Sequence, residues 1–237
     1  MDVASASEVI MPTIVFATPK GGAGKSTSAV LLATELASGG TGVTIIDADP
    51  NHPVARWGQL PGRPASLTVI EDVSERTIIR TIDEQAARTT FVIVDLEGTA
   101  SRMIPYAMSR ADLVIIPTRG SVLDAVEAVA AIREVKQQEE AFRISIPTVV
   151  LFTCTSAAIR PRTLSSIEAE FAANGVAVMK TRLHDREAFR ALFSFGGTLA
   201  GLDPASVRNV PAAVENAQAF AREVVTVLRT NRESAVA

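Results

Sequence analysis

Short runs of consecutive apolar residues recur along the chain and alternate with longer segments whose apolar residues are spaced as on one face of a helix. A continuous apolar run is typical of a parallel strand that is buried on both faces. The runs predict buried strands at Ile14–Ala17, Val43–Ile46, Leu67–Ile70, Phe91–Val94, Leu113–Ile116 and Val149–Phe152, and a further short strand at Val176–Val178.

Helical spacing marks the segments between these runs. The pattern predicts helices from Ser26 to Gly39, from a Ser74 cap to Arg88, from Val122 to Val135, from Leu164 to Ala173, from Arg186 to Phe193 and from Pro211 to Thr230. Strands that alternate with helices indicate right-handed crossovers and a mainly parallel sheet. The fold class predicted is therefore α/β, with helices on both faces of the sheet.

Composition limits the organisation of the chain. With 237 residues and 47% hydrophobic content, it can bury one large core. We expect one domain over residues 12–232, a flexible leader over 1–11 and a flexible tail over 233–237. No apolar run approaches the ~20 residues that cross a bilayer, and the first ten residues carry acids where a secretory leader carries basic residues. The single cysteine, Cys154, excludes a disulfide framework. We expect a soluble cytoplasmic protein.

The strongest chemical signal is TPKGGAGKST, from Thr18 to Thr27, which follows the first predicted strand and opens the first predicted helix. Small residues let backbone N–H groups approach an anion closely, and a helix N-terminus favours negative charge. The loop thus predicts a phosphate site for ATP, with Lys25 on the outer phosphates and the Ser26 hydroxyl on Mg²⁺. The loop residues expected to bind nucleotide are Gly21, Gly22, Ala23, Gly24, Lys25, Ser26 and Thr27. The alternative is a glycine-rich turn with two surface lysines.

The common phosphate-loop motif requires a first glycine, whereas this loop starts at Thr18 or Pro19 and carries an additional lysine, Lys20. KGGAGKS resembles the deviant phosphate loop of the ParA/MinD group of P-loop ATPases. The segments VDLEGTASR, LFTCTSAAIRPRTL and REAFRALFSFGGTLAGLDP also look like a small branch of plasmid-partition ParA ATPases. The resemblance covers nearly the whole chain and implies a single-domain P-loop NTPase, in which Lys20 would reach the nucleotide of a partner subunit.

Acidic residues follow two predicted strands. Asp95 ends an apolar strand, as in a Walker B motif, where a carboxylate holds Mg²⁺. The sequence DADPN resembles the second acidic motif of the ParA/MinD group, which implies that Asp49 positions the attacking water and that Asp47 lies near the metal. The alternatives are a solvent-exposed strand end for Asp95 and a turn before Pro50 for Asp49.

Two departures from the family pattern affect the nucleotide site. Glu97 stands where many ParA relatives have proline, and Cys154-Thr155 replaces an Asn-Arg or Asn-Lys pair that is often found near the adenine. The residues that hold the base therefore stay open. His52 and His184 lack metal-ligand spacing.

The net charge of −3 argues against a protein that coats nucleic acid, but it permits a local basic face. Arg143–Arg190 contains seven basic residues and four acidic ones. ParA proteins paired by ATP bind DNA without sequence preference, and the candidate contacts here are Arg160, Arg162, Arg186, Arg190, Arg222 and Arg229.

The resemblance implies an ATPase of DNA segregation. ATP would drive formation of a homodimer that binds double-stranded DNA on the nucleoid, and a ParB-like adaptor would trigger hydrolysis.

The alternative is a MinD-like regulator that cycles on membranes. It would need a basic amphipathic end, whereas Asn231–Ala237 is short, contains Glu233 and has no aromatic residue. We expect no membrane partner.

With nineteen residues before Lys20, an N-terminal helix-turn-helix domain of ~50 residues is not expected. A metabolic enzyme and a kinase with a tyrosine tail are disfavoured, because no substrate motif is visible and Tyr106 is the single tyrosine.

Overall fold

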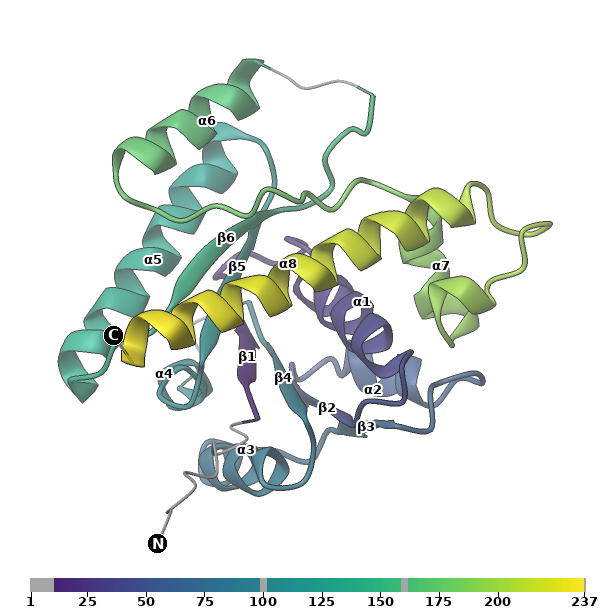
Figure 1. Ribbon diagram of the computed structural model, residues 1–237, viewed down its shortest axis with the longest axis horizontal. Helices are drawn as coiled ribbons and strands as arrows, with labels where there is room; N and C mark the ends of the chain where they lie inside the picture. The colour runs from purple at the N-terminus through teal and green to yellow at the C-terminus, as the bar shows by residue number, and fades with distance from the viewer. Residues whose placement is uncertain (1–10, 99–101, 159–161, 237) are drawn as a thin grey trace, which may run out of the picture.

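Six parallel strands form the centre of the computed structural model, which describes residues 11–98, 102–158 and 162–236 (Figure 1). The strand order is β3-β2-β4-β1-β5-β6. The strands are β1 (Thr13–Phe16), β2 (Val43–Ala48), β3 (Leu67–Ile70), β4 (Phe91–Leu96), β5 (Leu113–Thr118) and β6 (Thr148–Phe152). Because β1 lies between β4 and β5, the loop that follows it meets the carboxyl ends of both neighbours.

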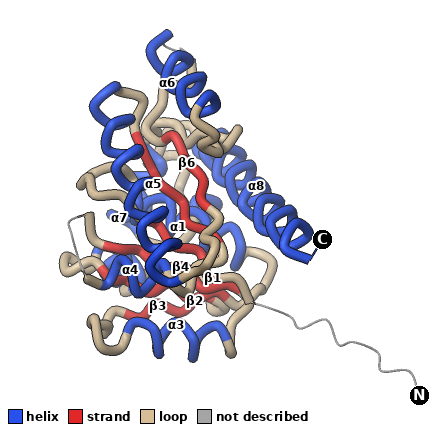
Figure 2. Tube along the Cα trace, turned by 90° about the vertical axis from the view of Figure 1, so that its left-hand side faces the viewer, coloured by secondary structure: helices blue, strands red, loops and turns tan. Residues whose placement is uncertain are grey.

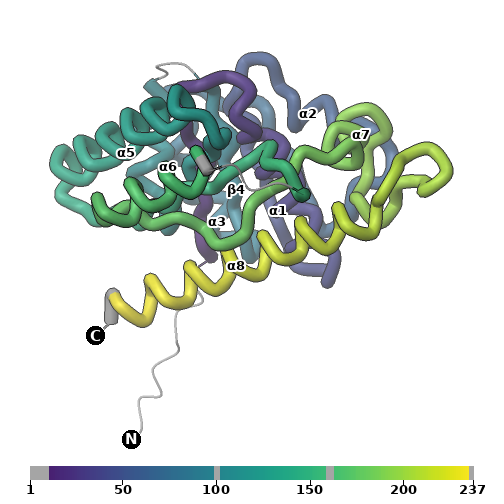
Figure 3. The backbone as a smooth tube through the Cα atoms, turned by 90° about the horizontal axis from the view of Figure 1, so that it is seen from above, coloured from purple at the N-terminus to yellow at the C-terminus, as the bar shows by residue number. Residues whose placement is uncertain are grey.

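Helices cover both faces of this sheet (Figures 1 and 2). One layer contains α1 (Lys25–Ala37), α2 (Pro53–Gly58), α7 (Glu187–Phe195) and α8 (Val210–Val236). The other contains α3 (Ile78–Ala86), α4 (Met103–Met108), α5 (Val122–Phe142) and α6 (Arg162–Ala173). A short 3-10 helix, Leu199–Gly201, precedes α8, which packs along the outside of α1 (Figure 3).

Alternation along the strands divides the core between these layers. Ile14 and Phe16 of β1 pack under α1 and α8, whereas Val15 packs under α5 on the opposite face. Both sets are fully buried, as expected of a parallel sheet covered twice. The predicted α/β fold with helices on both faces is confirmed. No helix in the described part of the chain combines the length and the apolarity that a membrane span requires.

The six main strands lie where the apolar runs predict them, but β2, β4 and β5 each continue two residues further. Asp47 and Asp95 therefore lie inside β2 and β4, where they are register partners on adjacent strands. Both have no exposed surface. The alternative of a solvent-exposed Asp95 is wrong, because the strand continues past it to Leu96.

Two short helices are absent from the sequence prediction. Helix α2 starts after His52, which has a positive φ of 47°, and α4 has Pro105 within its first turn. Both span six residues, too few for a helical period to stand out.

Several predicted boundaries are wrong. Helix α5 continues to Phe142, past the end predicted at Val135. Helix α3 starts at Ile78, because Ser74 opens a turn closed by a hydrogen bond from its N–H to the Thr77 hydroxyl oxygen. The segment 176–178 forms a single bridge, Val150 to Val178, and no strand. Helix α8 continues to Val236, into the residues expected to be a tail, since neither glycine nor proline interrupts it. The expected leader lies outside the described residues except for Met11.

Two surface loops meet closely at Gly196. It has a φ of +79°, and an added Cβ would overlap Leu60 and lie 2.8 Å from the Pro61 carbonyl oxygen. Gly40 has a similar φ of +80°, but an added Cβ would meet nothing within 4 Å.

We predict that Gly196→Ala lowers the free energy of unfolding by about 3 kcal/mol, through strain and overlap together. Gly40→Ala should cost about 1 kcal/mol, from backbone strain alone. Urea denaturation of both variants tests this, and equal losses would contradict the close approach.

Candidate functional site

A cavity of about 720 Å³ opens at the carboxyl edge of the sheet. Its walls are the phosphate loop with the start of α1, the segments that follow β2, β4, β5 and β6, and the chain around the start of α7. Ligands of open α/β sheets bind at this edge, outside the carboxyl ends of the strands.

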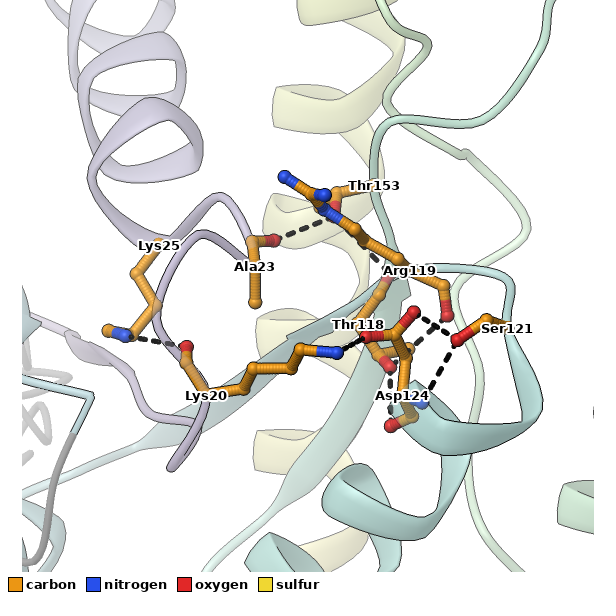
Figure 4. Close-up of polar contacts among 8 residues, drawn as sticks. All are labelled: Lys20, Ala23, Lys25, Thr118, Arg119, Ser121, Asp124 and Thr153. Carbon is orange, nitrogen blue, oxygen red and sulfur yellow. Dashed lines mark hydrogen bonds and ion pairs between the residues drawn. The ribbon is translucent and has the colours of Figure 1, made fainter.

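The phosphate loop is shaped by glycines and fastened by a distant threonine. Gly22 and Gly24 have φ of +73° and +94°, a region that side chains disfavour. Gly24 is also the N-cap of α1 and has no side chain to bond the first N–H groups of the helix. The Thr153 hydroxyl, at the end of β6, donates to the Ala23 carbonyl oxygen at 2.7 Å (Figure 4). The glycines and this hydrogen bond thus define the shape of a loop that lines the cavity.

The segment after β4 packs directly against this loop. An added Cβ at Gly98 would lie 3.1 Å from both the Gly21 nitrogen and the Lys25 ammonium nitrogen. A side chain at this position would therefore crowd the loop and its lysine.

Lys25 is buried at the base of the cavity. Its ammonium group donates to the carbonyl oxygens of Thr18 and Lys20, both at 3.4 Å. Burial lowers the pKa of Lys25, and the nearby carboxylates of Asp95, Asp49 and Glu97 act against that shift. Since its hydrogen bonds are long, the ammonium group is held loosely among these charges.

The two strand aspartates differ in what they bond. The Asp47 carboxylate accepts the Ala55 N–H at 2.8 Å and the Asp49 N–H at 3.3 Å. Burial raises the pKa of Asp47, and these two N–H groups act against the shift. Asp47 thereby fixes the start of α2 and the backbone at Asp49.

Asp95 has neither oxygen in a hydrogen bond of normal geometry with any described residue. Burial raises its pKa to about 7, while the nearby Ser26 hydroxyl lowers it and the Asp47 charge raises it. An unpaired buried carboxylate is costly, so this position favours a cation.

The donor set fits a magnesium ion that arrives with a nucleotide. The described residues contain no group of three or more His, Cys, Asp or Glu side chains placed to hold a metal. Mg²⁺ usually binds one or two carboxylates and completes its shell with substrate phosphates and water. Asp95 beside Ser26 meets this requirement, whereas the oxygens of Asp47 are already bonded.

Asp49 lines the cavity from the segment after β2. It is half-buried, and its carboxylate accepts the Asn51 N–H at 2.8 Å. The two roles considered from the sequence are therefore compatible, because Asp49 forms a turn and also faces the cavity.

Lys20 points elsewhere. Its ammonium group forms an ion pair with Asp124 at the start of α5 (Figure 4). The side chain is 42% exposed and is not part of the cavity wall. The structure thus brings Lys25, Ser26, Asp49 and Asp95 together and directs Lys20 away from them.

Three residues near the loop were not singled out from the sequence. Thr153 and Arg119 follow β6 and β5 at the same edge as the phosphate loop, so strand ends could have indicated them. The exposed guanidinium group of Arg119 lies near the loop, 3.7 Å from where a Cβ on Gly22 would stand. Asp124 lies 104 residues from Lys20, and no local pattern connects the two.

The cavity is also walled by residues that follow β6 and by residues around the start of α7. It is lined by Cys154, His184, Arg186 and Phe189. The Thr155 hydroxyl and the His184 Nδ1 share a hydrogen bond of 2.9 Å. Burial and the Arg186 charge lower the pKa of His184.

The described candidate DNA contacts lie on different helices. Arg186 and Arg190 line the cavity, and Arg190 pairs with Asp185. Arg222 and Arg229 are exposed on α8. Arg162 begins α6, and Arg160 lies outside the described residues.

Comparison with known proteins gives consistent matches. The VirC1 protein family model matches residues 11–229. Protein ParA of Rhizobium radiobacter is 44% identical over 214 residues, which covers 90% of this chain and 96% of the relative.

Among solved structures, MinD of Aquifex aeolicus has a TM-score of 0.68 at 16% identity, over 91% of this chain and 97% of that one. A putative plasmid partition protein of Borrelia burgdorferi B31, bound to AMPPNP, has a TM-score of 0.63 at 15% identity, over 91% and 98%. These structures share the fold of this chain.

Asp47 and Asp95 differ in their hydrogen bonds, so we predict that replacing each of them changes the free energy of unfolding in opposite directions. Asp95→Asn removes an unpaired buried charge, so it should raise the free energy of unfolding in EDTA by about 1–2 kcal/mol. Asp47→Asn should lower it by about 1–3 kcal/mol, because an amide oxygen cannot accept both N–H groups as the carboxylate does. Thermal and urea unfolding of both variants measures this. If both substitutions destabilise equally, the assignment of Asp95 as the unpaired carboxylate is wrong.

Proposed function

The chain belongs to the VirC1 family and to the ParA group of partition ATPases, and on that premise we propose that it hydrolyses ATP in order to switch between single and paired states on DNA. The observation that carries the proposal is the buried, unpaired Asp95 beside a glycine-shaped phosphate loop. The same cavity offers Lys25 and Arg119 as cations.

In this proposal the backbone N–H groups of the loop and Lys25 bind the phosphates of ATP. Ser26 and Asp95 hold Mg²⁺, which supplies charge neutralisation on the triphosphate. Asp49 accepts a hydrogen bond from the attacking water and sets its line of approach. Asp47 keeps the backbone of Asp49 in place through the N–H that it accepts.

Pairing of two copies would occur across the mouth of the cavity. Lys20 lies beside the phosphate loop with an exposed side chain, from where it would reach the nucleotide of the second copy. The first two turns of α5, next to Lys20, expose three aliphatic side chains: Val122 at 60%, Leu123 at 76% and Val126 at 61%. Covering this patch would favour association, because clustered exposed apolar residues often mark an interface.

DNA binding would follow from pairing. Arg222 and Arg229 are seven residues apart on the exposed side of α8, so they lie nearly in line along the helix. Two copies would present four such arginines to the phosphate backbone, without reading base sequence. A ParB-like adaptor would stimulate hydrolysis, and loss of the γ-phosphate would release the pair from the nucleoid.

Retention on DNA tests this cycle. The wild-type protein should be retained by non-specific double-stranded DNA with Mg·ATP, and much less with Mg·ADP or without nucleotide. Lys20→Gln should bind ATP normally but lose at least about tenfold in ATP-dependent retention, because a charge that neutralises the partner's phosphates is missing. Lys136→Gln, which changes an exposed lysine on α5, is the matched control. Normal retention by Lys20→Gln would reject the action of this lysine across the pair.

The salt dependence of retention tests the DNA surface. Each phosphate contact contributes about one unit to the slope of log affinity against log salt. Arg222→Ala/Arg229→Ala should therefore reduce that slope by about two per chain. The control Arg76→Ala/Arg133→Ala removes the same charge from exposed positions elsewhere and should change the slope little. Equal changes in the two double variants would show that α8 is not the DNA-binding surface.

A further inference from the structure

Lys20 and Asp124 form an ion pair that joins two distant parts of the chain. Lys20 belongs to the phosphate loop and Asp124 to the first turn of α5, and the sequence separates them by 104 residues. The fold brings them together because β1 and β5 are neighbouring strands, so the segments that follow them meet at one edge. Figure 4 shows the Lys20 side chain extended from the loop to the carboxylate.

Asp124 is held rigidly by its own helix. It is 5% exposed, and its second carboxylate oxygen accepts the Ser121 hydroxyl at 2.5 Å. Its N–H donates back to the Ser121 oxygen at 3.2 Å, which forms the N-terminal cap of α5. The Thr118 hydroxyl donates to the Asp124 carbonyl oxygen at 2.9 Å. Three atoms of Asp124 are thus hydrogen-bonded to groups other than Lys20.

The carboxylate is also stabilised in its charged form by groups other than Lys20. Burial acts to raise the pKa of Asp124, but hydrogen bonds from Lys20 and Ser121 together hold it below the usual value. The N-terminus of a 21-residue helix adds further favourable charge. If Lys20 leaves, Asp124 keeps the Ser121 hydroxyl and the helix terminus as partners. The ion pair can therefore open without leaving a bare buried charge.

Lys20 is free to move in a way that Asp124 is not. Its side chain is 42% exposed, and it lies on a loop rather than on a helix or strand. Its carbonyl oxygen accepts the Lys25 ammonium at 3.4 Å, so a shift of Lys20 is felt by the lysine that faces the cavity. In the proposed pairing, the ammonium group leaves Asp124 for the phosphates of a second subunit.

We propose that Asp124 is a positioning residue that holds Lys20 within its own subunit until the nucleotide of a second copy displaces it. The inference rests on the pairing described under the proposed function. Formation of the pair exchanges one carboxylate for the several anionic oxygens of a triphosphate, with no covalent step. Asp124 then sets the threshold for pairing, since every subunit must break its internal ion pair before it can bind the other.

The first experiment examines the contact in the nucleotide-free, full-length protein. An amine-reactive acylating reagent is applied, and modification of Lys20 and Lys136 is followed by peptide mass spectrometry. Asp124→Asn keeps an oxygen for the Ser121 hydroxyl but removes the charge that holds Lys20. It should raise the acylation rate of Lys20 about three- to tenfold, as expected for loss of an ion pair of this exposure. The rate at Lys136, exposed on the same helix, should not change.

Ser121→Ala is the structural control, because it removes the helix cap and leaves the carboxylate. It should change the acylation rate of Lys20 less than twofold. An unchanged Lys20 rate in Asp124→Asn would overturn the proposal. An equal increase in Ser121→Ala would also overturn it, since the effect would then reflect loosening of the start of α5.

The second experiment measures pairing with a non-hydrolysable ATP analogue and Mg²⁺ by analytical ultracentrifugation. Asp124→Asn should pair at about three- to tenfold lower protein concentration than wild type, since two internal ion pairs no longer oppose association. Equal or weaker pairing of the variant would overturn the holding role. A wild-type protein that never pairs would contradict the proposed function instead, and the acylation rates would still decide whether Asp124 restrains Lys20.

Discussion

Charge at the carboxyl edge of the sheet is the constraint on which the site depends. Register pairing of β2 with β4 places two carboxylates side by side, out of contact with water. One of them, Asp47, is stabilised by hydrogen bonds, because its carboxylate accepts N–H groups from the start of α2 and from Asp49. Asp95 is left beside Ser26 and Lys25, and neither of its oxygens has a hydrogen bond of normal geometry with a described residue. That imbalance makes the edge a site for a cation and its anionic ligand.

The phosphate loop is assembled by contacts that span the sheet. Its glycines permit the turn, but the Thr153 hydroxyl and the backbone at Gly98 fix where the turn lies. Both belong to segments that follow other strands, and the order of the strands brings them to β1. The local sequence therefore provides the conformational freedom of the loop, whereas the topology provides its position.

The sequence predicts much of this architecture for identifiable reasons. Mainly apolar runs mark all six strands, because most of these strands are covered on both faces; Thr44 and Thr68 interrupt the runs of β2 and β3. Helices α2 and α4 escape prediction because they are short, and α2 is held by Asp47 from another element. The loop motif points to Lys25 and Ser26, and both line the cavity together with Asp49. The partner of Lys20 could not be predicted, because only the packing of β5 against β1 brings Asp124 to it.

The two loop lysines occupy different environments in one subunit: Lys25 lies buried among carboxylates of the nucleotide cavity, and Lys20 is held outside it by Asp124. The central claim is that these arrangements belong to a molecule that pairs around ATP. The most direct test is the molar mass of Asp49→Ala by light scattering at saturating Mg·ATP, with Mg·ADP as the comparison. The account predicts twice the monomer mass with ATP and the monomer mass with ADP. A single mass of one subunit in both nucleotides would contradict it.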